Sequence, residues 1–178
     1  TTSDYASADY YYVNKSSLPK VYGGFNTSLS WKGFDLSAIF AYSIGGYIYN
    51  RDITMILHNG SLEGRAWSTE ILRRWTPDNR YTDVPALSTT SNNWNSASTR
   101  FLQNNSYMRL KNLTLSYNLP KPWISKLALS SVQVYVQGDN LFTIHKNQGL
   151  DPEQGITGIT YYRYPAMRTI SGGINIAF

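Results

Sequence analysis

Five segments of the chain alternate between apolar residues and small, uncharged polar residues. In the first, Val21, Phe25, Leu29 and Trp31 occupy alternate positions, and the residues between them include Asn26, Ser28 and Ser30. Successive side chains of a β-strand point to opposite faces, so this period of two predicts strands with one apolar and one polar face. The predicted strands are 21–31, 34–45, 107–119, 131–142 and 166–178. The pattern therefore predicts an all-β fold.

The polar faces of these strands carry almost no charge. Charged residues make up only 15% of the chain, against roughly 25% in an ordinary soluble domain. An apolar face opposite an uncharged polar face is typical of a transmembrane β-barrel, whose outside meets lipid and whose inside meets water or a plug. Each segment is long enough to span a membrane, which takes about 9 to 11 residues. A soluble β-sandwich remains the alternative.

Loop lengths predict how such a barrel would be oriented. Lys32-Gly33 is a two-residue turn signal, and the connection 120–130 is also short, whereas 46–106 and 143–165 are long. Outer-membrane barrels keep short turns in the periplasm and long loops outside. We therefore expect both long loops to be extracellular, together with residues 1–20 as a loop or strand end, and the C-terminus to be periplasmic.

The longer loop is predicted to contain short helices. Asp52 is a candidate N-cap for a helix over 53–58, which Asn59-Gly60 would end. A second helix is predicted over 65–75, ahead of Pro77.

Several motifs occur in a recognisable order. They are YGGF at 22–25, WKGFDLS at 31–37, RFL at 100–102, NSYMRLKNLTL at 105–115, YNLP at 117–120, VYVQGDNLFT at 134–143 and GLDPE at 149–153. This series resembles the SusC/RagA family of TonB-dependent outer-membrane transporters. Met108 and Ser116 are small departures from the family pattern, and residues 1–17 match none of it.

The resemblance implies that the chain supplies the C-terminal strands of a large transmembrane antiparallel β-barrel in a bacterial outer membrane of the Bacteroidetes type. The implied partners are a SusD-like surface lipoprotein, TonB, the barrel-assembly machinery, the remaining strands and plug of the same barrel, and lipid or lipopolysaccharide. The implied function is import of oligosaccharides or peptides, without a cofactor and without catalysis. Five strands are too few for a closed barrel, since single-chain barrels start at about 8 strands. We therefore expect the chain to be part of a larger protein.

Four loop aromatics are candidates for contact with cargo or with the lipoprotein lid. They are Trp67, Trp75, Tyr81 and Trp94. Flat rings can stack on sugars or on peptide side chains, and Trp94, in a run of Ser and Asn, is the better ligand candidate. For Trp67 and Trp75, two helical turns apart, packing of a loop helix is the alternative.

Ile174, Ile176 and Phe178 alternate along the last predicted strand. In the family that the chain resembles, such a pattern ending in an aromatic residue is the signal read by the barrel-assembly machinery. An ordinary strand is the alternative.

Other chemistry has little support in the sequence. Asp151 and Glu153 offer oxygen ligands for calcium, but a loop turn explains them as well. His58 and His145 are isolated, so no metal site is predicted, and the scattered basic residues behind the net charge of +5 do not predict nucleic-acid binding. The competing functions are a secreted carbohydrate-binding β-sandwich and, with less support, a barrel enzyme.

Overall fold

The computed structural model describes residues 4–60, 62–90, 93–127, 129–147, 149, 151–153 and 155–178. The first three residues of the predicted segment 1–20, and single positions in both predicted long loops, therefore lie outside the described residues. The chain divides into two compact units. The sheet unit consists of Leu18–Gly46, Asn104–Glu153 and Tyr164–Phe178, and the loop unit of Thr1–Ser17, Tyr47–Gln103 and Gln154–Arg163.

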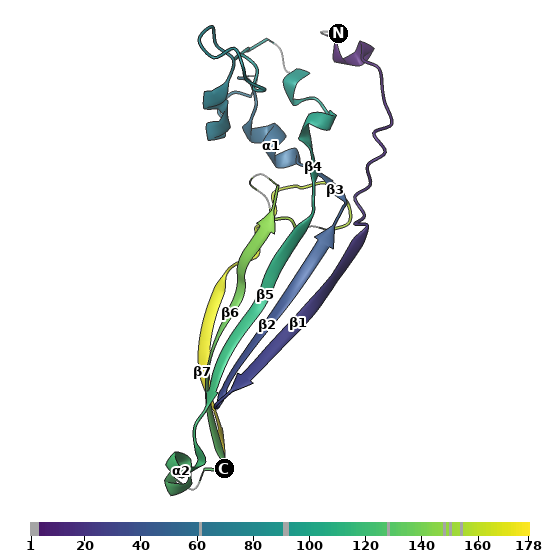
Figure 1. Cartoon of the computed structure of the whole chain (residues 1–178). Coiled ribbons are helices and arrows are strands. Elements are labelled where there is room, and N and C mark those ends of the chain that lie inside the picture. Colours follow the sequence, from purple (N-terminus) through teal and green to yellow (C-terminus); the bar gives the residue numbers. More distant parts are fainter. Residues whose placement is uncertain are drawn as a thin grey trace. The chain divides into compact units, whose positions relative to one another are not determined.

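The sheet unit is built on one five-stranded antiparallel sheet with the order β1-β2-β5-β6-β7 (Figure 1). Its strands are β1 (Val21–Trp31), β2 (Phe34–Ile44), β5 (Tyr107–Asn118), β6 (Ser131–His145) and β7 (Thr169–Ala177). The sheet is open, with β1 and β7 at its edges. The predicted all-β class is confirmed, and β6 extends three residues beyond the predicted end at 142.

Strand register places the apolar residues in rows on one face of the sheet. Leu36 lies opposite both Leu29 and Leu115, and Leu115 lies opposite Val136. These four side chains are all exposed, whereas Ala38 and Leu110 on the same face are buried. This row of the face is therefore open to its surroundings. The other face carries rows such as Ser28, Ser37, Thr114, Gln137 and Ser171, each directly opposite the next.

A β-bulge in β5 shifts its side-chain alternation. Ile39 pairs with Asn112 and the next residue of β2, Phe40, pairs with Leu110, so Lys111 is the extra residue. Before the bulge the even-numbered Leu110 shares a face with Phe40, whereas after it the odd-numbered Leu113 does. The bulge turns Arg109 toward the polar face, a placement that simple alternation does not predict.

Two short connections join strands of the sheet. Lys32 and Gly33 have φ values of 47° and 87°, the left-handed conformation that the predicted two-residue hairpin turn requires. The connection from β5 to β6 contains α2 (Lys121–Ile124) and the 3-10 turn η5 (Ser125–Leu127). No described helix is long and apolar enough to cross a membrane.

In the loop unit, β3 (Tyr47–Tyr49) pairs with β4 (Leu102–Asn104), and the main helix is α1 (Arg51–Ile56). The prediction that Asp52 caps this helix is wrong. Asn50 is the cap, because its side chain accepts a hydrogen bond from the Ile53 amide at 3.0 Å. Asp52 instead accepts from the backbone amide of Tyr162 at 2.9 Å.

The predicted second helix over 65–75 is also wrong. Only a 3-10 segment forms there, η2 (Thr69–Arg73), because the Ser68 side chain accepts from the Glu70 amide and caps the chain at that point. Three further 3-10 turns complete the elements: η1 (Tyr5–Ser7), η3 (Asn93–Asn95) and η4 (Thr99–Phe101).

The loop unit has a small hydrophobic core of its own. Leu57, Ile71 and Val84 are buried together, with Ile53 and Trp94 packed against them. This core holds the irregular segments in defined positions and so determines which loop aromatics are free to bind.

Candidate functional site

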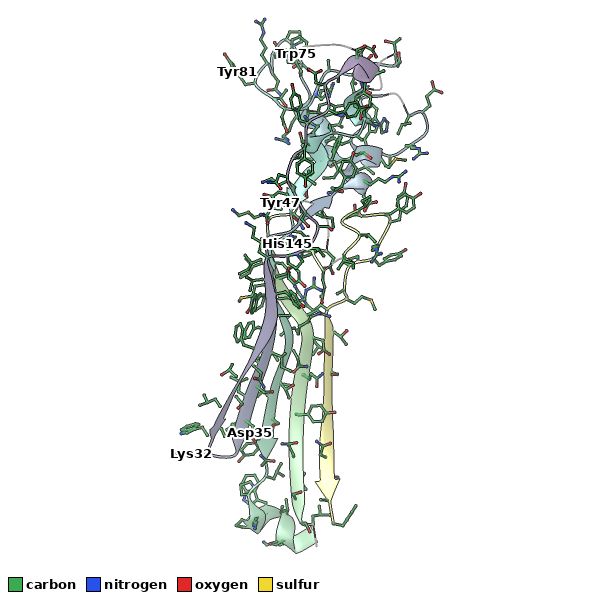
Figure 2. The ribbon with its side chains drawn as sticks, turned by 90° about the vertical axis from the view of Figure 1, so that its right-hand side faces the viewer. Lys32, Asp35, Tyr47, Trp75, Tyr81 and His145 are labelled. Carbon is green, nitrogen blue, oxygen red and sulfur yellow. The ribbon has the colours of Figure 1, made fainter. Side chains whose placement is uncertain are left out.

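Trp75 and Tyr81 lie on one turn of the loop unit. The Trp75 amide donates to the Val84 carbonyl at 2.8 Å, and an isolated bridge joins Thr76 to Asn79. Figure 2 shows Trp75 and Tyr81 at the same end of this unit, with Tyr81 directed away from the ribbon. Tyr81 is fully exposed and Trp75 is partly exposed. This turn therefore presents two rings and leaves them free of protein contacts on at least one side.

Further hydrogen bonds stabilise the conformation of this turn. The Asn79 amide group donates to the Arg73 carbonyl at 2.9 Å, and the Thr82 hydroxyl donates to the same carbonyl at 2.5 Å. Arg80 donates to the Pro77 carbonyl at 2.9 Å. These local contacts reduce the conformational entropy lost when a ligand binds the turn.

Trp67 is held by a histidine. Its indole N–H donates to Nδ1 of His58 at 3.0 Å, and the two rings meet edge to face with centroids 5.2 Å apart. Burial lowers the pKa of His58 below its ordinary value of 6.5, and the positive charge of Arg65 acts in the same direction. The imidazole therefore stays neutral at pH 7, and the neutral form is the one whose Nδ1 can accept this bond. Trp67 and Trp75 lie on either side of η2 rather than on one helix.

Trp94 is engaged on both its polar edge and one ring face. Its indole N–H donates to the Leu57 carbonyl at 2.7 Å, and the Arg100 guanidinium lies 3.4 Å from a ring centroid. It also packs against the small core. Trp94 is thus the ring most engaged by the chain itself, whereas Trp75 and Tyr81 are more exposed. Contact of any of these rings with a ligand stays a prediction.

A buried ionic cluster fixes the chain after β6 in the sheet unit. Arg109 donates from Nη2 to Asp151, from Nη1 to Glu153 at 2.8 Å, and from Nε to the Thr143 hydroxyl at 2.8 Å. Lys111 contacts both carboxylate oxygens of Glu153 at 2.6 Å. The side chains of Arg109 and Asp151 are only 4% and 7% exposed.

Asp151 is ionised in this cluster. Burial by itself raises its pKa, but backbone N–H groups of Ala166 and Glu153 and the Arg109 guanidinium together hold the pKa below the ordinary value of 3.8. Both candidate calcium-binding carboxylates are thus already bound to cations of the chain. Arg109 was not among the residues that the sequence indicated. The signal present in the sequence is an Arg within a predicted strand, upstream of an Asp-Pro-Glu loop.

Ile174 and Ile176 lie on the apolar face of β7, directly opposite Val134 and Val132. Both are exposed, as is Phe178. Their suggested role in barrel assembly stays a prediction.

The chain is similar to TonB-dependent receptors. No protein-family model matches it. It is 37% identical over 167 residues to TonB-dependent receptor P3 of Formosa agariphila, covering 87% of this chain and 16% of that receptor. It is 27% identical over 171 residues to TonB-dependent receptor SusC of Bacteroides thetaiotaomicron, covering 94% of this chain and 16% of SusC.

Solved structures give the same result. The RagAB peptide importer in its open-open state matches with a TM-score of 0.81 and 35% identity, over 93% of this chain and 18% of that one. The closed-closed state gives a TM-score of 0.79 with the same identity and coverage. The chain therefore spans less than a fifth of the length of these relatives.

Proposed function

Because the chain is homologous to one segment of TonB-dependent receptors of the SusC/RagA type, we propose that it forms part of the wall and outer loops of an outer-membrane importer. The relatives are receptors and transporters rather than enzymes, and a role without catalysis is proposed here too. The long loops would face the outside of the cell and the C-terminus the periplasm.

The observation that carries this proposal is the two-faced sheet. One face carries apolar side chains that are largely exposed on all five strands, and the other is polar with few charges. In a membrane barrel the first face would contact lipid, and the second would contact a hydrated lumen or a plug. A soluble β-sandwich would bury its apolar face under a second sheet, whereas the rows that contain Leu29, Leu36, Leu115 and Val136 are exposed. The alternative of a secreted carbohydrate-binding sandwich is therefore not favoured.

Cargo and partners follow from the homologues as proposals. RagAB is described as a peptide importer, so peptides are the first cargo to test, with oligosaccharides the second. We propose a SusD-like lipoprotein as the partner above the loops, and TonB as the source of energy through other parts of the complete protein. The exposed rings of Trp75 and Tyr81 are the proposed contact for cargo or lipoprotein.

Uptake measurements test the function. Cells lacking the complete receptor should no longer accumulate fluorescent peptides or oligosaccharides. Expressing the receptor again should restore this accumulation only while TonB is present. The receptor should also fractionate with the outer membrane. Unchanged uptake of both cargo classes, or recovery of the receptor in solution without detergent, would contradict the proposal.

Photo-cross-linking tests the loop contact. A benzophenone amino acid at position 81 of the complete receptor should cross-link to cargo or to the lipoprotein. Tyr164, which is almost fully exposed and belongs to the other long loop, is the control position. Equal cross-linking from positions 81 and 164 would show that the Trp75–Tyr81 turn has no special role.

A further inference from the structure

A cavity of about 580 Å³ lies within the loop unit, apart from the Trp75–Tyr81 turn. Two segments supply most of its lining, the N-terminal segment and the region from Ala97 to Leu102, and Tyr49 completes it. The residues that give the cavity its chemistry are Tyr5, Asp9, Tyr10, Tyr11, Tyr49 and Leu102. Its lining thus combines four tyrosine rings and one carboxylate with small and aliphatic residues.

A hydrogen bond connects the two main segments that line the cavity. The Tyr5 hydroxyl donates to the Ala97 carbonyl at 2.7 Å, which joins segments 92 residues apart. The turn that carries Tyr5 is capped by Asp4, whose side chain accepts from the Ala6 amide at 3.1 Å. Burial raises the pKa of Tyr49, which keeps its hydroxyl neutral and able to donate. The cavity is therefore a built feature rather than a gap between unconnected loops.

Asp9 gives this cavity its charge. The one hydrogen bond to its carboxylate among the described residues comes from the Tyr11 hydroxyl, and at 3.5 Å it is long. No ion pair joins Asp9 to a Lys or Arg in the described part of the chain. Tyr10 and Tyr11 are largely exposed, so their ring faces are open to a ligand.

Tyrosine ring faces and a carboxylate both bind cations preferentially. The negative face of an aromatic ring attracts cations, and cages of such rings bind ammonium groups. A carboxylate adds a charge-assisted hydrogen bond to the same group. A neutral or anionic ligand would gain neither contribution, and an anion would be repelled by Asp9.

We propose that this cavity binds an organic cation, an ammonium or guanidinium group carried on a chain or ring that fills the apolar space. The group could belong to a basic side chain of a peptide or to an amino sugar, and the two share the recognised chemistry. Binding of the cation can be measured without transport, so this proposal can be tested independently of the import function.

Calorimetry on the complete protein in detergent tests the proposal with two matched probe pairs. Gly-Lys-Gly is compared with Gly-norleucine-Gly, which keeps the stem without the ammonium, and glucosamine is compared with glucose. We expect at least one cationic probe to bind on the order of tenfold more tightly than its neutral match. The probe pair that differs in affinity shows whether the cation belongs to a peptide side chain or to an amino sugar. No difference in either pair would overturn the proposal.

Variants then locate the site. D9N keeps the shape of the side chain and removes its charge, and it should weaken the cationic probe on the order of tenfold. E63Q, at an exposed acid of the same unit that lines neither the cavity nor the Trp75–Tyr81 turn, should bind as the wild type does. Retained affinity in D9N, or an equal loss in E63Q, would overturn the assignment to this cavity.

Discussion

Single charged residues determine the conformation of the loop after β6. Arg109 is buried on the polar face of the sheet and contacts Asp151, Glu153 and Thr143. A buried guanidinium is costly unless all its partners are in place. Arg109 therefore ties a specific conformation of the Asp151–Glu153 segment to β5.

Replacing Arg109 with Met leaves the buried Asp151 carboxylate without its cation. We expect a loss of about 3 kcal/mol of stability, because the remaining charge stays desolvated. Chemical unfolding of the complete receptor and protease cleavage near Lys146 measure the effect. Lys111→Met is the control, since its pair with Glu153 is about a third exposed and should contribute less than about 1 kcal/mol. Equal losses of stability in both variants would contradict the difference expected between the buried pair and the partly exposed pair. Adding Asp151→Asn to Arg109→Met should restore part of the stability, because it removes the unpaired buried charge.

His58 makes the loop unit sensitive to acid. Its pKa in the folded state lies below 6.5 because of burial, so below pH 6.5 the unfolded chain binds a proton that the folded chain does not. Stability is therefore fully present above about pH 6.5 and declines as the pH falls toward the folded pKa. Protonation also removes the acceptor for Trp67.

Hydrogen exchange of the α1 region at pH 7.5 and pH 5.5, corrected for intrinsic rates, tests this expectation. Protection should be lower at pH 5.5 in the wild type and should differ less in His58→Gln. The same protection at both pH values in the wild type would count against it.

At the scale of elements, the local pattern determines strands better than helices. Each strand repeats one contrast over about ten residues, so its faces follow from sequence alone. The helical segments of the loop unit each begin at a single capping residue, Asn50 or Ser68. Neighbouring polar residues could cap the chain equally well, and the sequence pattern does not show which of them does. The error over 65–75 has this origin.

The two faces of β1 predict opposite tolerance to charge. Phe25→Lys places a cation on the apolar face near the middle of β1, which near the middle of a bilayer costs roughly 2 to 4 kcal/mol. Asn26→Lys, one position away, places it on the polar face and should cost less. The amount of heat-modifiable barrel in outer-membrane fractions measures both. Equal yields of the two variants would contradict a lipid-facing role for the apolar surface.

At the scale of the whole molecule, the open sheet has two unpaired edges. Backbone groups along β1 and β7 have no partners beyond the sheet in the described residues, and such edges are not tolerated in a bilayer. Closure by further strands of a larger barrel is the arrangement consistent with the homologues, which are several times longer.

The proposed assembly signal on β7 can be tested at this scale. Phe178→Asp should sharply lower the assembled barrel in the outer membrane if Ile174, Ile176 and Phe178 are read during assembly. Ala177→Ser, on the opposite face, is the matched control. Normal amounts of the Phe178→Asp barrel would leave these residues as an ordinary strand end.

The sequence by itself determined the class of the fold, the faces of the strands outside the β5 bulge and the hairpin turn at Lys32-Gly33. These features depend on neighbouring residues, and a period of two is visible wherever one face is apolar. Only the tertiary structure decided the bulge at Lys111, the packing of Trp94 against the small core and the pairing of Arg109 with Asp151, 42 residues apart. The tyrosine cavity likewise depends on a contact across 92 residues. Contacts over such separations are set by how the whole chain packs, and no local pattern encodes them.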